Sequence, residues 1–225
     1  MITLGYISPG TVATRFHESV VRLVRSDSRV DQIISLVSGP RIATARCDVV
    51  RDFLKSGNDW LFMVDSDMTF SPDVVEKFIE AANPRIRPVI GGLCFAGGRV
   101  GNPFPTLYAL VDPATNQGRL TKVVMDYPKD ALCKVDATGA AALFMHRSVL
   151  LDMEKNYGEM PDGYPNPHPW FAETVQLGQE YGEDWTFCMR LRKMKVPLYI
   201  HTGIKFGHVK THNYDESFFE RMRNG

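Results

Sequence analysis

Apolar and polar positions alternate along the first half of the chain in a way that predicts strands and helices in turn. Short apolar segments that end at Pro or Gly are typical of strands, whereas apolar residues spaced three and four apart are typical of helices. In the second predicted helix, Val49, Val50 and Phe53 lie on one side and Gly57 marks the end. The expected elements are strands at residues 2–8, 32–38 and 87–96 and helices at about 14–25 and 42–55.

The segment from Trp60 to Asp67 stands apart because five apolar residues in a row stop at two aspartates. An uninterrupted apolar run predicts a central strand that is covered on both faces. Ser71 is expected to cap the next helix, with Pro72 in its first turn. Strands that alternate with helices in this way predict an α/β fold with a mostly parallel sheet flanked by helices.

The second half of the chain is less regular. The expected elements are strands at 105–112 and 120–127 that form a hairpin or meander, a strand at 140–145, helices from about 148 and over 182–195, and a strand-like segment at 196–209. Asp184 is expected to be the N-cap of its helix. The stretch from Tyr157 to Trp170 contains four prolines and is predicted to be a loop. The polar tail, 210–225, is expected to lie on the surface.

Length and composition exclude several classes of protein. The 225 residues fit one α/β domain, and equal totals of 26 basic and 26 acidic residues give a net charge of zero. No overall basic field therefore drives the chain onto nucleic acid or an anionic membrane. The four cysteines form no CxxC pair, so we expect buried free thiols. Without a leader-like segment or an apolar stretch that could span a bilayer, we expect a soluble cytoplasmic protein.

The first candidate site is Asp65-Ser66-Asp67, at the end of the predicted central strand. Ligands of open α/β sheets bind beyond the carboxyl ends of the strands. Residues two apart on an extended chain point the same way, so both carboxylates can face one divalent cation. The alternative is a plain turn, since aspartates commonly end strands and begin helices. Taken alone, this motif favours the turn.

Two further candidates lie late in the chain. In Gly182-Glu183-Asp184, one carboxylate can cap the helix and the other can act as a general base for an acceptor hydroxyl. His208 follows a glycine near the end of the last strand, where an imidazole can reach a metal; a structural histidine is the alternative. Carboxylate and imidazole ligands suit Mn²⁺ or Mg²⁺, and the nitrogen donor favours Mn²⁺.

Other motifs are absent or ambiguous. The glycines at 91–92 and 97–98 lack the GxGxxG spacing of a dinucleotide site, and neither a P-loop nor a GxSxG elbow is present. The aromatic residues of the proline-rich stretch can stack on a sugar or gate a site, or the stretch can be a rigid surface connection. These residues are Tyr164, His168, Trp170 and Phe171.

Five blocks in a fixed order carry a resemblance to a known family. They are PRIATARCDVVRDFL, WLFMVDSDMTFSPDVVEKF, VDATGAAALFMHRSVL, GEDWTFCMRLRKMKVPLYI and FGHV. This layout resembles the GT-A glycosyltransferases, in particular the small family 2-like enzymes, over most of the chain from about Gly5 to Val209. The resemblance implies a single GT-A domain over 1–225. Its donor-binding half would be about 1–100, its acceptor-side half about 101–209, and its tail 210–225.

The resemblance also implies roles for individual residues. Asp67 resembles the direct metal ligand, Asp65 its partner near the ribose or the metal, and His208 the late histidine of the metal shell. Asp184, with Glu183, resembles the catalytic base of the inverting members. The donor-side residues implied are Tyr6, Ser8 and Pro9 at the nucleotide base and Arg46, with Arg41 nearby. On residue chemistry alone, Arg46 fits a phosphate contact and a surface ion pair equally well.

The implied activity is transfer of a sugar from a nucleotide-diphosphate sugar to an acceptor hydroxyl. The acceptor stays open among protein, glycan, modified nucleobase and small molecule. Two departures from the family pattern are His201, which receives no role, and the small-residue segment 138–142, which we interpret as close packing. The alternatives are a sugar-nucleotide nucleotidyltransferase, whose glycine- and arginine-rich signature is missing here, and a non-catalytic sugar-nucleotide or glycan-binding module.

Overall fold

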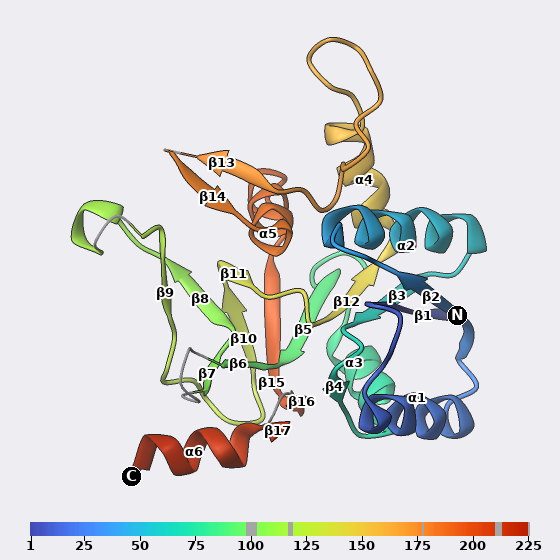
Figure 1. Cartoon of the computed structure of the whole chain (residues 1–225), viewed down its shortest axis with the longest axis vertical. Helices are drawn as coiled ribbons and strands as arrows, with labels where there is room; N and C mark the ends of the chain where they lie inside the picture. Colours follow the sequence, from blue (N-terminus) through green and yellow to red (C-terminus); the bar gives the residue numbers. More distant parts are fainter. Residues whose placement is uncertain (98–102, 117–118, 177, 210–212, 225) are drawn as a thin grey trace.

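A seven-stranded sheet forms the centre of the computed structural model (Figure 1). The structure describes residues 1–97, 103–116, 119–176, 178–209 and 213–224. The strand order is β10-β15-β5-β12-β3-β1-β2. The strands are β1 (Ile2–Ser8), β2 (Val30–Val37), β3 (Trp60–Val64), β5 (Val89–Leu93), β10 (Leu132–Val135), β12 (Ala142–His146) and β15 (Leu198–Lys205).

Five strands of this sheet run in the same direction. β1 pairs in parallel with β2 and β3, and β15 pairs in parallel with β5. β12 runs antiparallel to its neighbours β3 and β5, and β10 runs antiparallel to β15. The predicted α/β fold with a mostly parallel sheet is therefore confirmed. The carboxyl ends of β1, β3, β5 and β15 meet at one edge, together with the start of β12.

Helices cover both faces of the sheet. The helices α2 (Ile42–Ser56), α4 (Arg147–Tyr157) and α5 (Glu183–Lys193) pack into one core, and α1 (Thr14–Ser26) and α3 (Val74–Ala81) pack into another. Alternate residues of β3 enter the two cores: Leu61 and Met63 face α2, whereas Phe62 faces α1 and α3. All five residues of β3 are buried, which confirms the prediction of a strand covered on both faces.

Smaller sheets extend the second half of the molecule. The predicted hairpin is present as β8 (Leu107–Leu110) and β9 (Thr121–Val123), which pair antiparallel, and β11 (Ala137–Thr138) pairs with β8 on the other side. The remaining short strands are β4 (Met68–Thr69), β6 (Phe95–Gly97), β7 (Pro103–Pro105), β13 (Thr174–Gln176), β14 (Gln179–Tyr181), β16 (Gly207–Val209) and β17 (Asn213–Tyr214). β16 pairs with β4, and this pairing brings the late chain beside the end of β3.

Two predicted helix caps are wrong. The N-cap of α3 is Asp73 and not Ser71, whose backbone carbonyl instead accepts a hydrogen bond from Val74 at 3.1 Å. The N-cap of α5 is Gly182, so Asp184 is the second residue of the helix. At α5, an acidic side chain in the first turn still interacts favourably with the positive end of the helix. Acidic residues are therefore common both at caps and in first turns, and the sequence does not separate the two positions.

The tail is only partly as expected. Residues 210–212 and 225 lie outside the described residues, as does Gly98 of the glycine-rich segment. Beyond them the chain forms α6 (Glu216–Asn224), whose Phe219 is buried against Leu93 and Phe95. The helix α6 thus holds the C-terminal tail against the end of β5 and the start of β6. Among the described residues, no helix has both the length and the apolar character that crossing a bilayer requires.

Candidate active site

The DSD motif lies at the carboxyl edge of the sheet, as the sequence predicts. Backbone hydrogen bonds hold it there on two sides: the N–H of Asp65 donates to the carbonyl of Ala141 at 3.0 Å, and the N–H of Ala13 donates to the carbonyl of Ser66 at 3.1 Å. The first contact comes from the segment before β12 and the second from the start of α1. The motif therefore joins the exit loop of β1 to the segment before β12.

Asp67 and His208 lie side by side although 141 residues separate them in the sequence. The Nε2 atom of His208 is 3.1 Å from Oδ2 of Asp67, and the side chains are 17% and 32% exposed. The Nδ1 atom of His208 is 2.9 Å from the carbonyl oxygen of Phe95. Since a carbonyl only accepts hydrogen bonds, Nδ1 is the donor to Phe95. Nε2 donates to the Asp67 carboxylate when it carries a proton and is the nitrogen that could bind a metal when it does not.

This pair has the chemistry of two metal ligands. A metal-binding histidine usually donates its other ring N–H to a backbone carbonyl or carboxylate, as His208 does to Phe95. Two donors in adjacent positions around an octahedral ion, each at about 2.1 Å, are about 3 Å apart, close to the separation seen here. Within the described ranges, no group of three or more His, Cys, Asp or Glu side chains is arranged to hold a metal. Ligands from a bound phosphate and water would complete such a shell.

Arg46 connects the other predicted carboxylates. Its Nη2 donates to Oδ1 of Asp65 at 2.7 Å, and its Nε donates to Oε1 of Glu183 at 3.3 Å. Its Nη1 donates to the carbonyl of Ala140 at 3.2 Å. Burial disfavours the cation, but Asp65 and Glu183 outweigh this and raise the pKa of Arg46 above its usual value. The side chain is 6% exposed, so the predicted ion pair exists but is internal rather than on the surface.

Glu183 and Asp184 begin α5 with their carboxylates in different surroundings. Glu183 is held by Arg46, whereas Oδ1 of Asp184 accepts a hydrogen bond from the backbone N–H of Trp185 at 2.6 Å. Burial raises the pKa of Asp184, and the neighbouring charge of Glu183 raises it further. A carboxylate with a raised pKa is a stronger base than an ordinary aspartate. A Cβ atom at Gly139 would lie 3.7 Å from Oδ2 of Asp184, so the small-residue segment forms part of its surroundings.

The predicted donor-side residues of the first strand occupy the same edge. Ser8 is buried at the end of β1, and its carbonyl accepts a hydrogen bond from the N–H of Ser38 at 2.9 Å. Tyr6 packs edge-to-face on Phe16, and Pro9 is exposed. Arg41 is exposed and is the N-cap residue of α2. The Ala13–Ser66 hydrogen bond brings the loop after β1 to the DSD motif. Contact of Tyr6, Ser8, Pro9 and Arg41 with a nucleotide stays a prediction.

The aromatic residues before Asp184 do not act together. Trp170 and Phe171 are fully buried, and the indole N–H of Trp170 donates to the carbonyl of Leu150 at 2.8 Å. Stacking of these two rings on a sugar is therefore ruled out by their burial in the core between α2, α4 and α5. The Nε2 atom of His168 and Oγ1 of Thr44 share a hydrogen bond of 2.9 Å. Tyr164 is 69% exposed on the loop between α4 and β13, which projects from the rest of the protein (Figure 1). Stacking or gating by Tyr164 and His168 stays a prediction.

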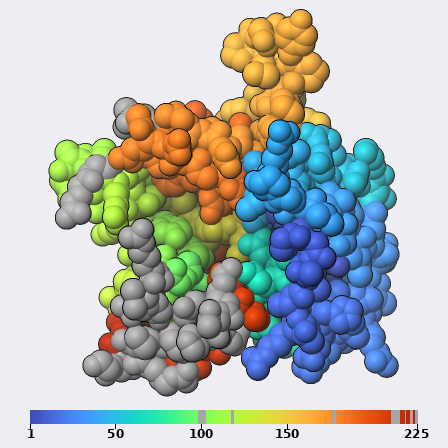
Figure 2. Space-filling model, viewed as in Figure 1, coloured from blue at the N-terminus to red at the C-terminus, as the bar shows by residue number. Residues whose placement is uncertain are grey.

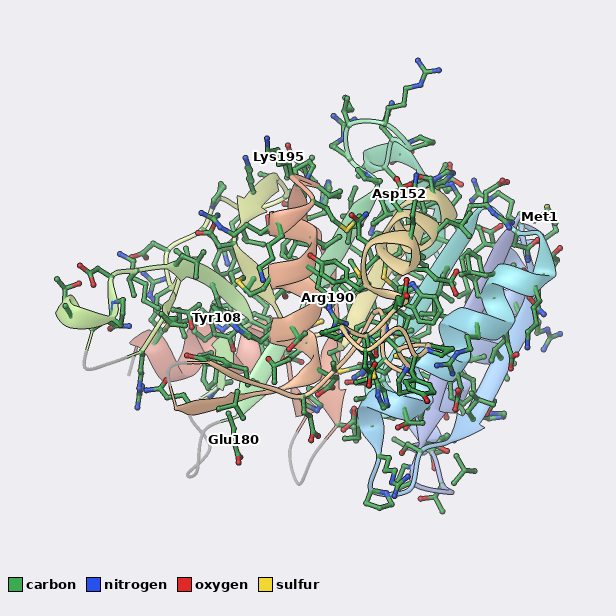
Figure 3. The ribbon with its side chains drawn as sticks, turned by 90° about the horizontal axis from the view of Figure 1, so that it is seen from above. Met1, Tyr108, Asp152, Glu180, Arg190 and Lys195 are labelled. Atoms are coloured by element: carbon green, nitrogen blue, oxygen red, sulfur yellow. The ribbon has the colours of Figure 1, made fainter. Side chains whose placement is uncertain are left out.

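One face of the molecule is hollowed. Figure 2 shows a recess between the N-terminal segments in blue and the β13–β14 region in orange. Seen from above, α5 with Arg190 lies between the N-terminal half and the strand that carries Tyr108 (Figure 3). A cavity of about 520 Å³ opens beside the start of α5. It is lined by Glu173, Thr174, Val175, Glu180, Tyr181 and Gly182.

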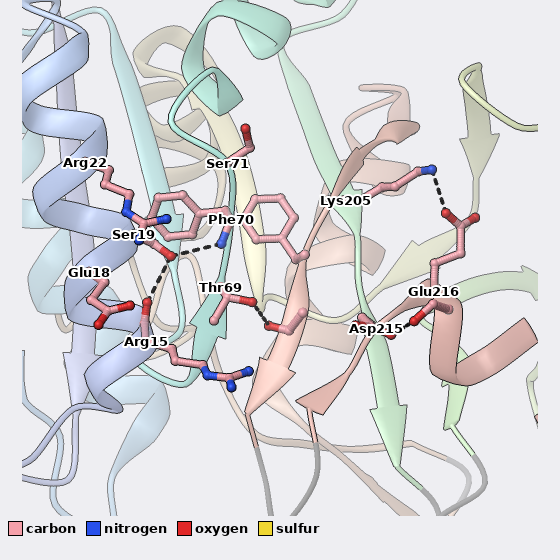
Figure 4. Close-up of a pocket in the computed structure, with 13 residues that line it drawn as sticks. Arg15, Glu18, Ser19, Arg22, Thr69, Phe70, Ser71, Lys205, Asp215 and Glu216 are labelled. Carbon is pink, nitrogen blue, oxygen red and sulfur yellow. Dashed lines mark hydrogen bonds and ion pairs between the residues drawn. The ribbon is translucent and has the colours of Figure 1, made fainter. Parts of the chain in front are cut away.

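A separate cavity of about 580 Å³ lies between α1, β4 and the start of α6 (Figure 4). It contains none of the predicted site residues, although Thr69 and Gly207 in its wall neighbour the DSD motif and His208 in the sequence. Three basic and three acidic side chains line it, and Lys205 pairs with Glu216 at 2.7 Å. Balanced charge gives this cavity no preference for an anion or a cation.

Sequence reasoning missed the contacts that hold the site residues. Nothing in the sequence pattern pointed to Phe95, whose carbonyl orients His208, or to Ala140, whose carbonyl binds Arg46. Backbone carbonyls carry no residue-type signal, so only the fold reveals them. Cys94 lies close enough to the DSD motif that the charges of Asp65 and Asp67 add to burial in raising the pKa of its thiol.

Solved structures with the same fold exist. The chain is similar to GalNAc-T7, crystallised with UDP, GalNAc and Mn²⁺, with a TM-score of 0.57 and 9% identity over 100% of this chain and 47% of that one. It is also similar to protein A197 from STIV, with a TM-score of 0.55 and 18% identity over 93% and 86% of the two chains. The chain thus spans about half the length of the GalNAc-T7 chain.

By sequence, no family model and no curated protein matches. The structural likenesses define the class of fold: a mixed α/β chain with the GT-A fold of nucleotide-sugar glycosyltransferases, as the sequence blocks predict. At these levels of identity, the fold is what the comparisons establish.

Proposed function

We propose that this protein is a metal-dependent glycosyltransferase that transfers a sugar from a nucleotide-diphosphate sugar to an acceptor hydroxyl with inversion. One observation carries the proposal. The Asp67–His208 pair and the Asp65–Arg46–Glu183 cluster lie at the carboxyl edge of a GT-A sheet, and Asp184 follows directly after that cluster. Ligands of such sheets bind at this edge.

The donor side is proposed to be built from the first half of the chain, about 1–100. Tyr6, Ser8 and Pro9 would border the nucleotide base, and Arg41 and Asp65 would lie toward the ribose and phosphates. Asp67 and His208 would hold Mn²⁺ or Mg²⁺, which stabilises the charge of the departing diphosphate. The imidazole nitrogen favours Mn²⁺. Mn²⁺ and UDP in the GalNAc-T7 crystal support uridine diphosphate sugars as the first donors to test.

Asp184 is proposed as the base because Arg46 already holds Glu183. Its carboxylate takes the proton of the acceptor hydroxyl as the oxygen forms a bond to the anomeric carbon. The bond from that carbon to the phosphate oxygen breaks, and its electron pair leaves with the nucleoside diphosphate. Attack from the side opposite the leaving group inverts the anomeric carbon. The raised pKa of Asp184 makes it a better proton acceptor for a weakly acidic hydroxyl.

The acceptor half is proposed to span about 101–209. The cavity beside Gly182 is next to the proposed base and is large enough for part of an acceptor. A protein side chain, a glycan, a modified nucleobase and a small molecule all present a suitable hydroxyl.

The test is release of nucleoside diphosphate from candidate sugar nucleotides with Mn²⁺. We expect slow release by hydrolysis without an acceptor, complete loss with a chelator or with Asp67→Ala, and a large decrease with Asp184→Asn. The matched control is Asp73→Asn, an exposed carboxylate at the start of α3, which should release nucleoside diphosphate like the wild type. Tight donor binding without turnover by any donor would refute the enzyme and favour a sugar-nucleotide-binding module.

A further inference from the structure

We infer that Arg46 is a positioning residue that holds the donor-side carboxylate Asp65 and the start of the base-bearing helix α5 in one fixed arrangement. This inference rests on the proposed glycosyltransferase function and assigns Arg46 a role different from a phosphate contact. It follows from where the guanidinium group points, from which elements it joins, and from the aromatic packing around it.

The guanidinium group is directed into the protein on all sides. Its three nitrogens donate to Asp65, to Glu183 and to the carbonyl of Ala140, and Nη1 also lies 3.6 Å from the sulfur of Met63. With 6% of the side chain exposed, little of it faces the recess. A phosphate ligand needs N–H groups that point at the ligand, whereas these are used by partners within the fold.

Arg46 joins three elements that are distant in sequence. It lies on α2, Asp65 follows β3, and Glu183 is the first residue of α5. A planar guanidinium presents its donors in a rigid fork, so two carboxylates bound to it keep a fixed separation. Because Asp184 directly follows Glu183, the arginine sets where the proposed base lies relative to the donor side.

Aromatic packing supports the same connection. The Phe171 ring centre is 6.0 Å from the Arg46 guanidinium carbon, and Phe171 stacks on Phe187 of α5 with centroids 4.7 Å apart. α5 is thus held against Arg46 by a ring pair as well as by the ion pair. A lysine at this position would supply one point charge and could not bind both carboxylates in a fork.

Nucleotide binding provides the first test and needs no turnover. Calorimetry with Mn²⁺ compares uridine with UDP, and guanosine with GDP, on the wild type and on Arg46→Lys. If Arg46 acts through Asp65, the affinity for the nucleoside and the affinity for the diphosphate fall by the same factor, about 10-fold. A loss confined to the diphosphates would overturn the inference in favour of a phosphate contact. Absence of nucleotide binding by the wild type would overturn both this inference and the proposed function.

Coupling in kcat provides the second test. We expect Arg46→Lys to lower kcat by about 100-fold through misplacement of the base, and Glu183→Gln to lower it by about 10-fold. The double variant should be no slower than Arg46→Lys, because both changes break the same connection. Additive effects would refute the positioning role. If Arg46→Lys does not fold, the pair Asp65→Asn and Glu183→Gln tests the same coupling, since the arginine lies between these carboxylates.

Arg51→Met is the matched control on the same helix. Arg51 pairs with Asp48 and with the carbonyl of Pro167, and neither partner belongs to the site. We expect its nucleotide affinities and kcat to stay within about twofold of the wild type. If the wild type binds nucleotides but turns over no donor, the proposed function fails, while the comparison of nucleoside with diphosphate still decides the role of Arg46.

Discussion

Asp184→Asn should make the protein more stable at neutral pH while it abolishes most of the proposed transferase activity. The ionised carboxylate of Asp184 is disfavoured in the folded state because it is poorly solvated and lies beside Glu183. Asparagine has nearly the same shape and keeps an oxygen that can accept the hydrogen bond from the N–H of Trp185. The substitution therefore removes the unfavourable charge with little change in packing.

The sign of the effect follows from the direction of the pKa shift. Since the pKa of Asp184 in the folded state lies above its ordinary value of 3.8, folding is favoured by protonation. At a pH below the ordinary pKa, the carboxyl group is protonated in both the folded and the unfolded state, so the charge costs nothing. The cost appears as the pH rises above the ordinary pKa and is complete above the raised pKa of the folded state. Each pKa unit corresponds to about 1.4 kcal/mol. We expect a gain of about 1 kcal/mol in the free energy of unfolding at pH 8, which raises Tm by about 2–4 °C.

Thermal melts of the wild type and Asp184→Asn between pH 4 and pH 8 measure this difference, and donor turnover is measured alongside. The gain should shrink toward pH 4, and turnover should fall by about 10²- to 10⁴-fold. Glu183→Gln is the matched control: it should lower stability, by about 1 kcal/mol, because Arg46 loses a charged partner. A lower Tm for Asp184→Asn at pH 8 would refute the reasoning, since it would mean that the fold stabilises this charge.

Two further predictions concern the Asp67–His208 pair and the sheet. His208→Asn should weaken Mn²⁺-dependent nucleotide binding in calorimetry by about 10- to 100-fold, whereas His201→Asn should leave it within about twofold; equal effects would contradict a metal role for His208. Gly92→Ala should lower the free energy of unfolding by about 1–3 kcal/mol in denaturant titrations, because the added Cβ would lie 2.2 Å from the ring of Phe206. An unchanged midpoint for Gly92→Ala would show that the Phe206 ring moves aside without cost.

The sequence by itself determined the parts of this fold that depend on local pattern. The uninterrupted apolar run of β3 predicted a strand covered on both faces, and the structure buries all five residues. The alternation of strands and helices predicted the mostly parallel sheet, and the position of the DSD motif after β3 predicted its location at the carboxyl edge. These features follow from the spacing of apolar residues within a short stretch of chain, which the sequence shows directly.

Helix starts were less well determined: at α5 an acidic residue serves equally as a cap and in the first turn, and at α3 both Ser71 and Asp73 are residue types that cap helices. At α5 the cap is Gly182, and at α3 it is Asp73. The aromatic residues Trp170 and Phe171 could likewise be assigned to a surface or to a core only once the packing of α2, α4 and α5 was known. An aromatic ring after a proline-rich stretch has no periodic context that indicates which side it faces.

Only the tertiary structure decided how the site residues combine. Arg46 reaches Glu183 across 137 positions, and His208 reaches Asp67 across 141. Such pairings depend on how β16 aligns with β4 and how α5 packs beside α2, and no local pattern specifies them. The sequence could name the residue types that bind a cation or accept a proton. Which of them share a hydrogen bond, and which are withdrawn from solvent, is set by the packing of elements that are distant along the chain.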